Sequence, residues 1–513
     1  MPTLDQGDSG EANEVVAPRD SKELGAKTTS GLLWMASSNV LRTSLKIFFF
    51  FLLGNLLAPK DFGVIAASTI IISFSNILSD LGISQAIIYL PQLTKRSIAS
   101  AGTFSLITGV LLACMVLAAS PICGWFFEND EVVPVLAFLS LIFVFRGVSN
   151  VAEGLIRRDL RFKILAVRET AIFFLAQGCI GVPLAFFGFG YWSLAIAQLT
   201  SEVVRCIVIL SSERRVSFGR MYWNELKPLF EFGSGVSLGT IINRVAVQAD
   251  NVIVGSQLGF DQLGVYSRAY QLAAMPANNF GSIGSRVLFP ALTAINQDRS
   301  KVRRVFEDIV TAVATLALPG SVVLACIAPP WVLYLLGPKW ANMLLPFQIL
   351  SFAIYFRLGY KIHGTVIRSL GKTKVQAIMQ LEYLIGISTG AYIGSKFGLE
   401  GIAIGVAFAV TLHYVLMAKV AGNLLSIPLR GILAWHWRGL LSAVLVLGLA
   451  ALCTIAFPLL SLEFTLLFSV LTSFLCLASL VARMPLLLRN QDVEKLVQFA
   501  RKKRAKSKKQ LTS

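Results

Sequence analysis

The sequence predicts an all-α polytopic membrane protein of about 14 transmembrane helices, with two parallel six-helix lobes around a central cavity and a C-terminal hairpin. Three observations lead to this fold class. Of 513 residues, 55% are hydrophobic and 14% charged, whereas soluble domains carry about 25% charged residues. Apolar runs of about twenty residues, long enough to cross a hydrocarbon core of roughly 30 Å, recur along the chain. A short sequence pattern, called here the repeated phrase, also occurs twice in the chain, which predicts an internal repeat.

The apolar runs define the predicted helices in chain order. They lie at 32–57, 62–90, 98–121, 132–155, 169–187, 191–210, 233–258, 263–288, 306–328, 341–365, 375–394, 401–424, 439–460 and 464–483. The longer runs must tilt or continue past the membrane interface.

The repeated phrase reads GNLLAPKDFGVIAAS at 54–68 and GSQLGFDQLGVYSRA at 255–269, so Gly63 recurs as Gly264. The period contains six helices, and an even number brings both copies into the membrane in the same direction. This predicts parallel repeats related by an axis along the membrane normal. The N-terminal lobe then covers 31–210 and the C-terminal lobe 233–424. The alternative is that helical bundles reuse glycine-rich turns without any repeat.

The distribution of basic residues predicts the topology. One set of alternate loops, together with both tails, holds 33 Lys and Arg residues, and the opposite set holds only Lys60, Lys339 and Lys396. The positive-inside rule therefore predicts that both tails are cytoplasmic. The cytoplasmic parts include the polar tail 1–30, the inter-lobe loop 211–232 and the basic tail 484–513. The segment 425–483 consists of a cytoplasmic loop followed by the C-terminal hairpin.

The net charge of +18 does not indicate nucleic-acid binding, because the bases lie in short loops between apolar runs. The tail RKKRAKSKK at 501–509 is expected to lie on anionic lipid, with about 1 kcal/mol gained per base near the surface. An equally good interpretation is that this tail only anchors the topology.

The turns LAPKDFGVIAAS and LGFDQLGVYSRAYQL, the segment LLGPKWANMLLPFQILS and the six-plus-six layout resemble a known family. They look like Wzx-type polysaccharide exporters, the lipid-linked oligosaccharide flippases of the multidrug/oligosaccharidyl-lipid/polysaccharide superfamily, and above all the colanic-acid and succinoglycan exporters. The resemblance implies flipping of undecaprenyl-pyrophosphate-linked oligosaccharide across the bacterial inner membrane, for exopolysaccharide or lipopolysaccharide assembly. Polysaccharide polymerase and export machinery are then possible partners.

Basic side chains inside the predicted spans indicate where an anionic cargo binds. A central charge facing lipid costs about 2.5–3.5 kcal/mol, so these groups are expected to face a hydrated interior. Arg also presents a planar fork that matches phosphate oxygens. The predicted pyrophosphate and sugar contacts are Arg42, Lys46, Arg146, Arg244, Gln248, Asn251, Arg268, Arg357 and Lys361. The rival interpretation is structural ion pairs, for example with Asp250 or Asp80, and Arg205 is expected to pair with Glu202.

The energy source is predicted to be an ion gradient. GKT occurs at 371–373, but Val366 stands where a phosphate-binding loop needs glycine, so no nucleotide site is expected. Carboxylates in or near the spans, Asp80, Asp250 and Glu382, are the candidates for carrying H⁺ or Na⁺. We expect no cofactor and no metal site, because His363, His413 and His436 share no metal-like spacing. His363 lies beside the bases of the predicted helix 341–365 and could titrate, but packing is the favoured interpretation for it.

Two other functions are alternatives to the flippase. A polysaccharide polymerase or ligase needs catalytic groups on a sizeable outer loop, whereas the outer loops hold three bases and no histidine, so an enzyme is not expected. The alternative transporter is a cation-coupled multidrug antiporter of the same superfamily. A cationic drug requires acidic rather than basic groups in the cavity, so the excess of bases favours an anionic cargo.

Overall fold

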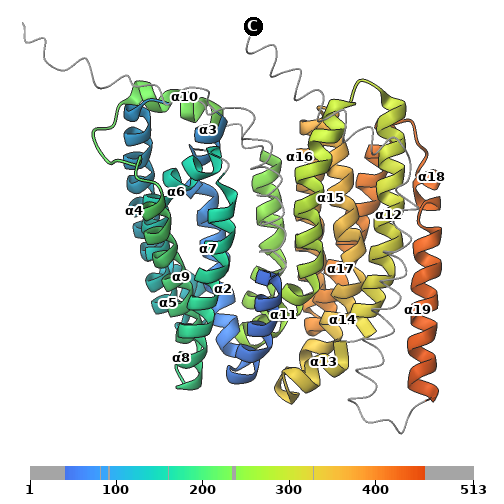
Figure 1. Cartoon of the computed structure of the whole chain (residues 1–513). Coiled ribbons are helices and arrows are strands. Elements are labelled where there is room, and N and C mark those ends of the chain that lie inside the picture. Colours follow the sequence, from blue (N-terminus) through green and yellow to red (C-terminus); the bar gives the residue numbers. More distant parts are fainter. Residues whose placement is uncertain are drawn as a thin grey trace, which may run out of the picture. The chain divides into compact units, whose positions relative to one another are not determined.

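The computed structural model describes residues 41–80, 83–89, 93–159, 161–233, 238–326 and 328–456, which are nearly all helical (Figure 1). Packing divides the chain into two compact units. The first contains the residues up to Ser237 together with Gly259–Gly264, and the second contains Leu238–Leu258 and the residues from Val265 onward. The predicted helix 464–483 and the tails 1–30 and 484–513 lie outside the described residues.

The first unit begins with helical residues 41–56. It continues with α2 (Pro59–Asp80), α3 (Ile83–Tyr89), α4 (Lys95–Phe126), α5 (Val132–Leu139), α6 (Leu141–Arg158), α7 (Phe162–Phe174), the π-helix η1 (Leu175–Gly181), α8 (Val182–Phe186), α9 (Tyr191–Ser212) and α10 (Trp223–Gly233). Helix α4 packs on α6 through two glycines that allow close backbone approach. A Cβ on Gly109 would lie 2.5 Å from the carbonyl oxygen of Phe143, and one on Gly147 would lie 2.6 Å from that of Ser105.

The second unit is built from most of α11 (Leu238–Ala294), α12 (Arg299–Cys326), α13 (Ala328–Leu335), the 3-10 helix η2 (Pro338–Met343), α14 (Leu344–Phe352), α15 (Ile354–Ser369), α16 (Thr373–Ser395), α17 (Gly398–Leu424), α18 (Leu429–Ala434) and α19 (Trp437–Ala456). Helices α15, α16 and α17 pack against one another, as do α12 and α19. The α16–α17 hairpin is held by paired glycines, because a Cβ on Gly390 would lie 2.6 Å from the carbonyl oxygen of Gly405.

Within the described residues, 7 helices are long and apolar enough to cross a membrane. They include Lys95–Phe126, Tyr191–Ser212 and Gly398–Leu424, which lie close to the predicted spans 98–121, 191–210 and 401–424. The protein is therefore a multi-pass helical membrane protein, as predicted.

Three short helices lie where hydropathy predicted only loops. Helix α10 lies in the loop 211–232, α13 largely in 329–340, and α18 in 425–438. A hydropathy window misses such helices because they are short or amphipathic. Several predicted helices are also interrupted: 132–155 is divided into α5 and α6, and 169–187 contains η1.

Both copies of the repeated phrase contain a break between two helices, as predicted. The first break is at Leu57 and Ala58, before α2. The second is at Gly259, whose φ of 79° and ψ of −179° interrupt the long helix α11. Glycine suits this position because positive φ is costly for residues with a Cβ. The segment Gly259–Gly264 packs within the first unit, although the helices on both sides of it belong to the second.

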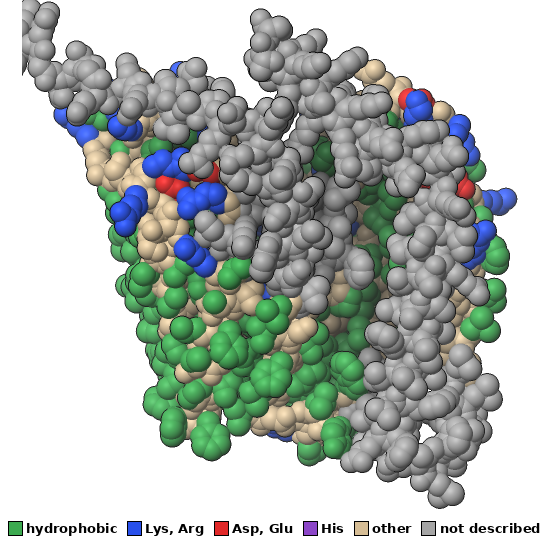
Figure 2. Space-filling view, in the orientation of Figure 1, with side chains coloured by type: hydrophobic (Ala, Val, Ile, Leu, Met, Phe, Trp, Pro, Cys, Tyr) green, Lys and Arg blue, Asp and Glu red, His purple; other side chains and the backbone are tan. Residues whose placement is uncertain are grey.

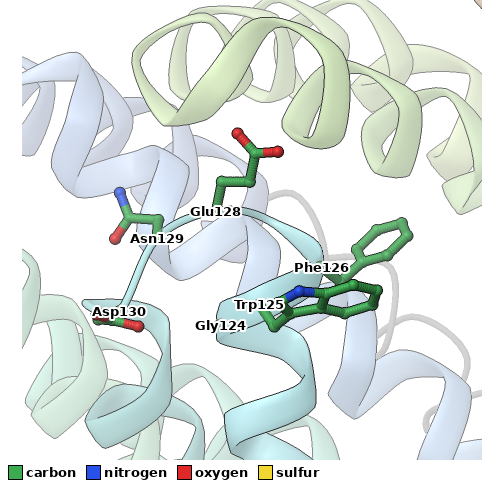
Figure 3. A pocket seen from close by; sticks show the side chains of 6 residues that line it. All are labelled: Gly124, Trp125, Phe126, Glu128, Asn129 and Asp130. Carbon is green, nitrogen blue, oxygen red and sulfur yellow. The ribbon is translucent and has the colours of Figure 1, made fainter.

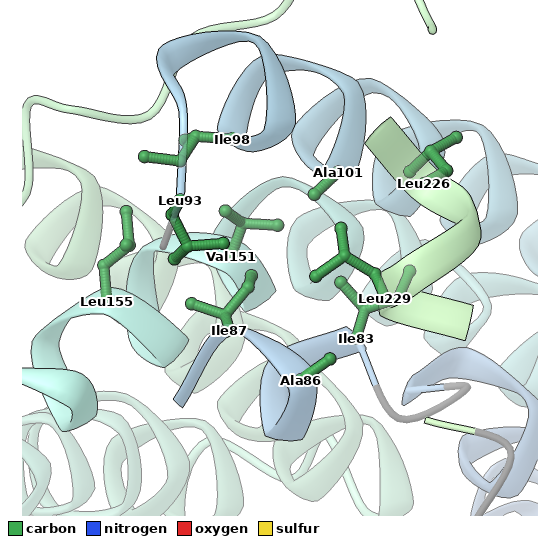
Figure 4. Close-up of a cluster of buried hydrophobic side chains, with 10 residues drawn as sticks. All are labelled: Ile83, Ala86, Ile87, Leu93, Ile98, Ala101, Val151, Leu155, Leu226 and Leu229. Atoms are coloured by element: carbon green, nitrogen blue, oxygen red, sulfur yellow. The ribbon is translucent and has the colours of Figure 1, made fainter. Parts of the chain in front are cut away.

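The inter-lobe segment is folded onto the first unit. Leu226 and Leu229 of α10 are buried in a hydrophobic cluster with Ile83, Ile87 and other side chains of α3, α4 and α6 (Figure 4). Thr94 caps α4 and also donates a hydrogen bond to Glu225, with 3.1 Å between oxygens. This segment is therefore an integral layer of the first unit.

Charge is unevenly distributed over the surface of the first unit. In Figure 2, Lys and Arg side chains gather toward the end of this unit at which α10 lies, and hydrophobic side chains cover much of the rest. An apolar girdle with bases at one end is the surface expected of a membrane-spanning bundle.

Candidate functional site

A chain of alternating charges runs through the first unit. Arg42 pairs with Glu169 of α7. Arg205 of α9 bridges Glu169 and Glu153, with N···O distances of 3.3 and 3.1 Å. Glu153 of α6 also pairs with Arg157 one turn later. Alternation of sign lets each charge stabilise its neighbours inside an apolar bundle, where isolated charges are costly.

A further pair extends this charged region. The Arg146 guanidinium lies 2.6 Å from the carboxylate of Glu202. The sequence expectation that Arg205 pairs with Glu202 is thus wrong in detail: Arg205 hydrogen-bonds Glu153 and Glu169, and Glu202 acts on it only as a nearby charge. Lys46 is exposed, and it interacts electrostatically with Arg42 and Glu169.

The structure identifies carboxylates that the sequence interpretation missed. The sequence interpretation named Asp250 and Asp80 as examples of partners if Arg42 formed a structural ion pair. Its partner is instead Glu169. Asp80 ends α2, and its side chain lies outside the described residues. The available signal was a set of glutamates, Glu153, Glu169 and Glu202, at positions within the predicted spans or at their ends. The pairs remain partly open to solvent, since the side chains of Arg42 and Glu169 are 33% and 32% exposed.

The second unit has a buried polar centre around Asp250. Asp250 lies on α11 and is 1% exposed. Its carboxylate accepts hydrogen bonds from the Tyr266 hydroxyl and from the backbone N–H of Asn251, each at 2.9 Å. Buried charge of this kind requires compensation by donors and an opposite charge.

Arg357 supplies that opposite charge. It lies on α15, is 8% exposed, and interacts electrostatically with Asp250. Its guanidinium donates to the Tyr270 hydroxyl and stands 4.3 Å from the centre of the same ring. The sequence predicted Arg357 for the substrate and Asp250 for the ion, and the structure brings both into one electrostatic cluster.

The remaining predicted residues of α11 and α15 lie at different depths. Arg268 is 9% exposed and donates to Gln271 at 3.0 Å, and Lys361 donates to Asn278 at 3.3 Å. The predicted stripe Arg244, Gln248 and Asn251 runs from an exposed guanidinium to a buried amide. The Oδ1 atom of Asn251 has no hydrogen-bond partner among the described residues.

Glu382, the third carboxylate predicted for ion coupling, has a histidine partner. The Nδ1 atom of His413 on α17 lies 2.7 Å from the Glu382 carboxylate on α16. The sequence interpretation assigned His413 no partner and missed this pair, because spacing along the chain does not show that two helices bring the groups together.

A surface pocket of about 390 Å³ lies at the turn between α4 and α5 (Figure 3). It is lined by Gly124, Trp125, Phe126, Glu128, Asn129 and Asp130. Two carboxylates make this pocket unsuitable for a pyrophosphate, so the basic groups described above remain the better candidates for an anionic ligand.

Comparison with solved structures identifies the fold. The chain is similar to the lipid II flippase MurJ in an inward closed conformation, with a TM-score of 0.72, 13% identity, and coverage of 89% of this chain and 100% of that protein. It is also similar to an inward-facing multidrug resistance MATE family transporter of the MOP superfamily, with a TM-score of 0.60, 16% identity, and coverage of 75% and 98%. These likenesses show a shared transporter fold.

Sequence relatives come from polysaccharide assembly. The chain is 23% identical to the teichuronic acid biosynthesis protein TuaB of Bacillus subtilis (strain 168), over 67% of this chain and 71% of that protein. It is 25% identical to the lipopolysaccharide biosynthesis protein WzxC of Escherichia coli (strain K12), over 64% and 67%. The family model described as "Polysaccharide biosynthesis protein" matches residues 52–345, which is more than half of the chain. The chain therefore belongs to this family of polysaccharide biosynthesis proteins.

Proposed function

We propose that this protein flips a lipid-linked oligosaccharide, carried on undecaprenyl pyrophosphate, from the inner to the outer leaflet of the bacterial inner membrane. Its family acts in polysaccharide biosynthesis, and its fold is that of transporters rather than of catalysts. Its structural neighbour MurJ is a lipid II flippase, and its relative ExoT from Rhizobium meliloti (strain 1021) is a succinoglycan biosynthesis transport protein. Both names support the same class of cargo.

The observation that carries the proposal is the charged chain in the first unit. Arg42 and Arg146 lie within helical segments, and each is about one-third exposed and forms an ion pair with a carboxylate. A pyrophosphate offers more acceptor oxygens and more charge than a single carboxylate, so it is able to displace Glu169 or Glu202 from the guanidinium fork. In the empty site, Glu169 and Glu202 neutralise the positive charges of the two arginines, so the site is stable within the membrane.

The architecture that fits this function has fourteen helices, two six-helix lobes with the boundaries 31–210 and 233–424, and both termini in the cytoplasm. The two compact units and the break within each copy of the repeated phrase support this layout. The gathering of Lys and Arg at one end of the first unit supports the orientation, because that end carries the inter-lobe segment.

Transport in this scheme is driven by an ion gradient, with H⁺ or Na⁺ as the coupling ion. Asp250 and Glu382 are the two predicted coupling carboxylates whose side chains the structure describes, and each is held by defined partners. The polysaccharide polymerase and export machinery would receive the flipped unit, and the basic tail 484–513 would contact anionic lipid.

The test is deletion of the gene followed by analysis of undecaprenyl-linked intermediates and surface polysaccharide. The expected result is loss of the polysaccharide, with a complete repeat unit stranded on the cytoplasmic leaflet. The stranded glycan then identifies the cargo. Normal polysaccharide together with altered sensitivity to cationic drugs would instead support the multidrug antiporter.

A further inference from the structure

The α16–α17 hairpin contains a buried pair of titratable groups that no step of substrate binding uses. His413 is fully buried on α17, and its Nδ1 atom lies 2.7 Å from the Glu382 carboxylate. Its Nε2 atom is buried and has no hydrogen-bond partner among the described residues. The Glu382 side chain is 25% exposed, so its carboxylate reaches the surface of the second unit.

Packing alone does not account for these two residues. A glutamate within an apolar helix and an imidazole nitrogen without a hydrogen-bond partner among the described residues each destabilise the fold. An apolar pair of similar volume is often at least as stable as a buried polar pair. Ionisable groups kept inside membrane helices generally serve transport of charge.

We propose that Glu382 and His413 together form the proton-binding site that couples this transporter to a proton gradient. The inference rests on the proposed flippase function, and it selects H⁺ rather than Na⁺ as the coupling ion. With the carboxylate ionised and the imidazole neutral, the pair carries one negative charge. One added proton, held on His413 or on Glu382, makes the pair neutral.

Protonation changes the environment in which the pair is stable. The neutral pair is less costly to withdraw from water than the negative pair, which requires a hydrated or cationic environment. Proton binding therefore favours conformations in which the Glu382 side chain is buried, and proton release favours those in which it is exposed. This difference in stability is what allows a proton gradient to bias a conformational cycle.

The surroundings of the pair favour a proton over a metal cation. Hard cations require several oxygen ligands, whereas this site offers one carboxylate and one imidazole. Among the described residues, no group of three His, Cys, Asp or Glu side chains is arranged to hold a metal. The two helices that carry the pair pack closely, since a Cβ on Gly394 of α16 would lie 2.2 Å from the carbonyl oxygen of Gly401 of α17.

Other titratable groups lie close to the pair on α15 and on the pair's own helices α16 and α17. Tyr383 of α16 stacks 4.5 Å from the His413 ring, and Tyr360 of α15 lies 4.9 Å from it. His363 of α15 interacts electrostatically with His413 and with His436. His363 and Tyr414 are ring neighbours, 5.0 Å apart.

The same tyrosines connect this pair to the cluster in the second unit. Tyr383 and Tyr360 interact electrostatically with Arg357, and Tyr383 also with Asp250. The proton site is thereby coupled electrostatically, through Tyr360 and Tyr383, to Arg357 of α15 and Asp250 of α11.

The test uses the full-length protein in proteoliposomes with a fluorescent polyprenyl-pyrophosphate disaccharide as the probe. Flipping is measured by loss of accessibility to an external quencher, with and without an imposed pH gradient. The wild-type protein is expected to flip the probe about tenfold faster under a pH gradient and to show no response to a Na⁺ gradient. The variants Glu382→Gln and His413→Asn are expected to lose this acceleration.

The variant Glu382→Asp should retain the acceleration, because it still offers a carboxylate. The matched control is His363→Asn, which removes another fully buried histidine that bonds the carbonyl oxygen of Gly359 instead of a carboxylate. Its response to the gradient should be that of the wild type. Thermal unfolding checks the fold of every variant, and His413→Gln replaces any variant that fails to fold.

The outcomes separate the two proposals. Unchanged acceleration in Glu382→Gln and His413→Asn would overturn the proton site, as would wild-type flipping that responds to Na⁺ alone. Either result leaves the flippase function intact. A wild-type protein that does not flip the probe under any gradient would instead contradict the proposed function.

Discussion

Gly63 and Gly264, which occupy matching positions in the repeated phrase, make reciprocal backbone contacts. A Cβ on Gly63 would lie 1.9 Å from the carbonyl oxygen of Phe260, and a Cβ on Gly264 would lie 1.8 Å from that of Pro59. Pro59 and Phe260 are themselves separated by the same 201 positions as the two glycines. The two copies of the repeated phrase are thus in contact with each other.

This contact predicts the effect of adding one methyl group. Gly63→Ala and Gly264→Ala should each destabilise the protein by at least about 1–3 kcal/mol, because the methyl group meets backbone that cannot move aside. Thermal unfolding in detergent measures the effect. Gly320→Ala is the control, since nothing lies within 4 Å of its Cβ and alanine is the better helix former. Equal stability of Gly63→Ala and Gly320→Ala would contradict the contact.

Arg244 provides a test of anion recognition with little effect on folding. Its side chain is exposed at the start of the polar stripe on α11, so Arg244→Gln should leave membrane levels unchanged. Loss of a charge-assisted hydrogen bond, about 1.5–3 kcal/mol, should reduce export at least tenfold. Surface polysaccharide is the readout, and Arg303→Gln, an exposed residue of α12, is the control. Wild-type export by Arg244→Gln would remove this residue from the site.

Glu213 makes the docking of the inter-lobe segment depend on pH. Burial alone would raise the pKa of Glu213, but the hydrogen bonds and charge of Arg215, together with the charge of Arg161, outweigh it and lower this pKa. A carboxyl group with a lowered pKa in the folded state stabilises the fold at neutral pH, and this contribution is lost as the pH falls through the lowered value. Hydrogen exchange of residues 213–233 should therefore accelerate on acidification from roughly pH 5 to 3.

A variant separates this effect from general acid unfolding. Arg215→Ala removes the guanidinium that contacts Glu213 at 2.7 Å and Asp159 at 2.5 Å. Exchange of the same segment should be faster already at neutral pH, by a factor corresponding to about 1–3 kcal/mol. Arg220→Ala, an exposed residue of the same segment, should behave as the wild type. Identical exchange in the two variants would show that Arg215 does not hold the segment.

The packing of α19 on α12 depends on one glycine. A Cβ on Gly439 would lie 2.3 Å from the carbonyl oxygen of Ala314, whereas nothing lies within 4 Å of a Cβ on Gly448 in the same helix. Gly439→Ala should therefore separate α19 from its cluster with Val322 and lower the unfolding temperature. Gly448→Ala should leave that temperature unchanged or raise it. A disulfide trap between cysteines placed on α12 and α19 would report the separation directly.

Hydropathy predicted the helical membrane class and several of the spans, because the membrane imposes apolar length. Spans such as 191–210 and 401–424 agree with α9 and α17 within a few residues, since apolar length determines them. Helix α10 was not predicted, because its apolar side chains make only a short amphipathic pattern, and their burial depends on α3 and α4 being beside it.

The site was predicted as a set of residue types rather than as pairs. Arg42, Arg146 and Glu382 were recognised because charges are unusual in apolar runs. Their partners Glu169, Glu202 and His413 come from other helices, and a single sequence does not show which helices are neighbours. Whether the predicted residues bind cargo stays a prediction, as does the role of Asp80.

The burial of Leu226 and Leu229 within the first unit also determines where the polypeptide can be split into two separately expressed fragments. A gene cut directly after α9 would produce one fragment with an uncovered apolar surface on α3 and another that begins with an unpartnered amphipathic helix. A cut between α10 and α11 keeps that helix with the surface that it covers. Co-expressed fragments should therefore reassemble into an active transporter only when the break follows α10, so the boundary between independently synthesised halves lies beyond the loop that hydropathy suggests.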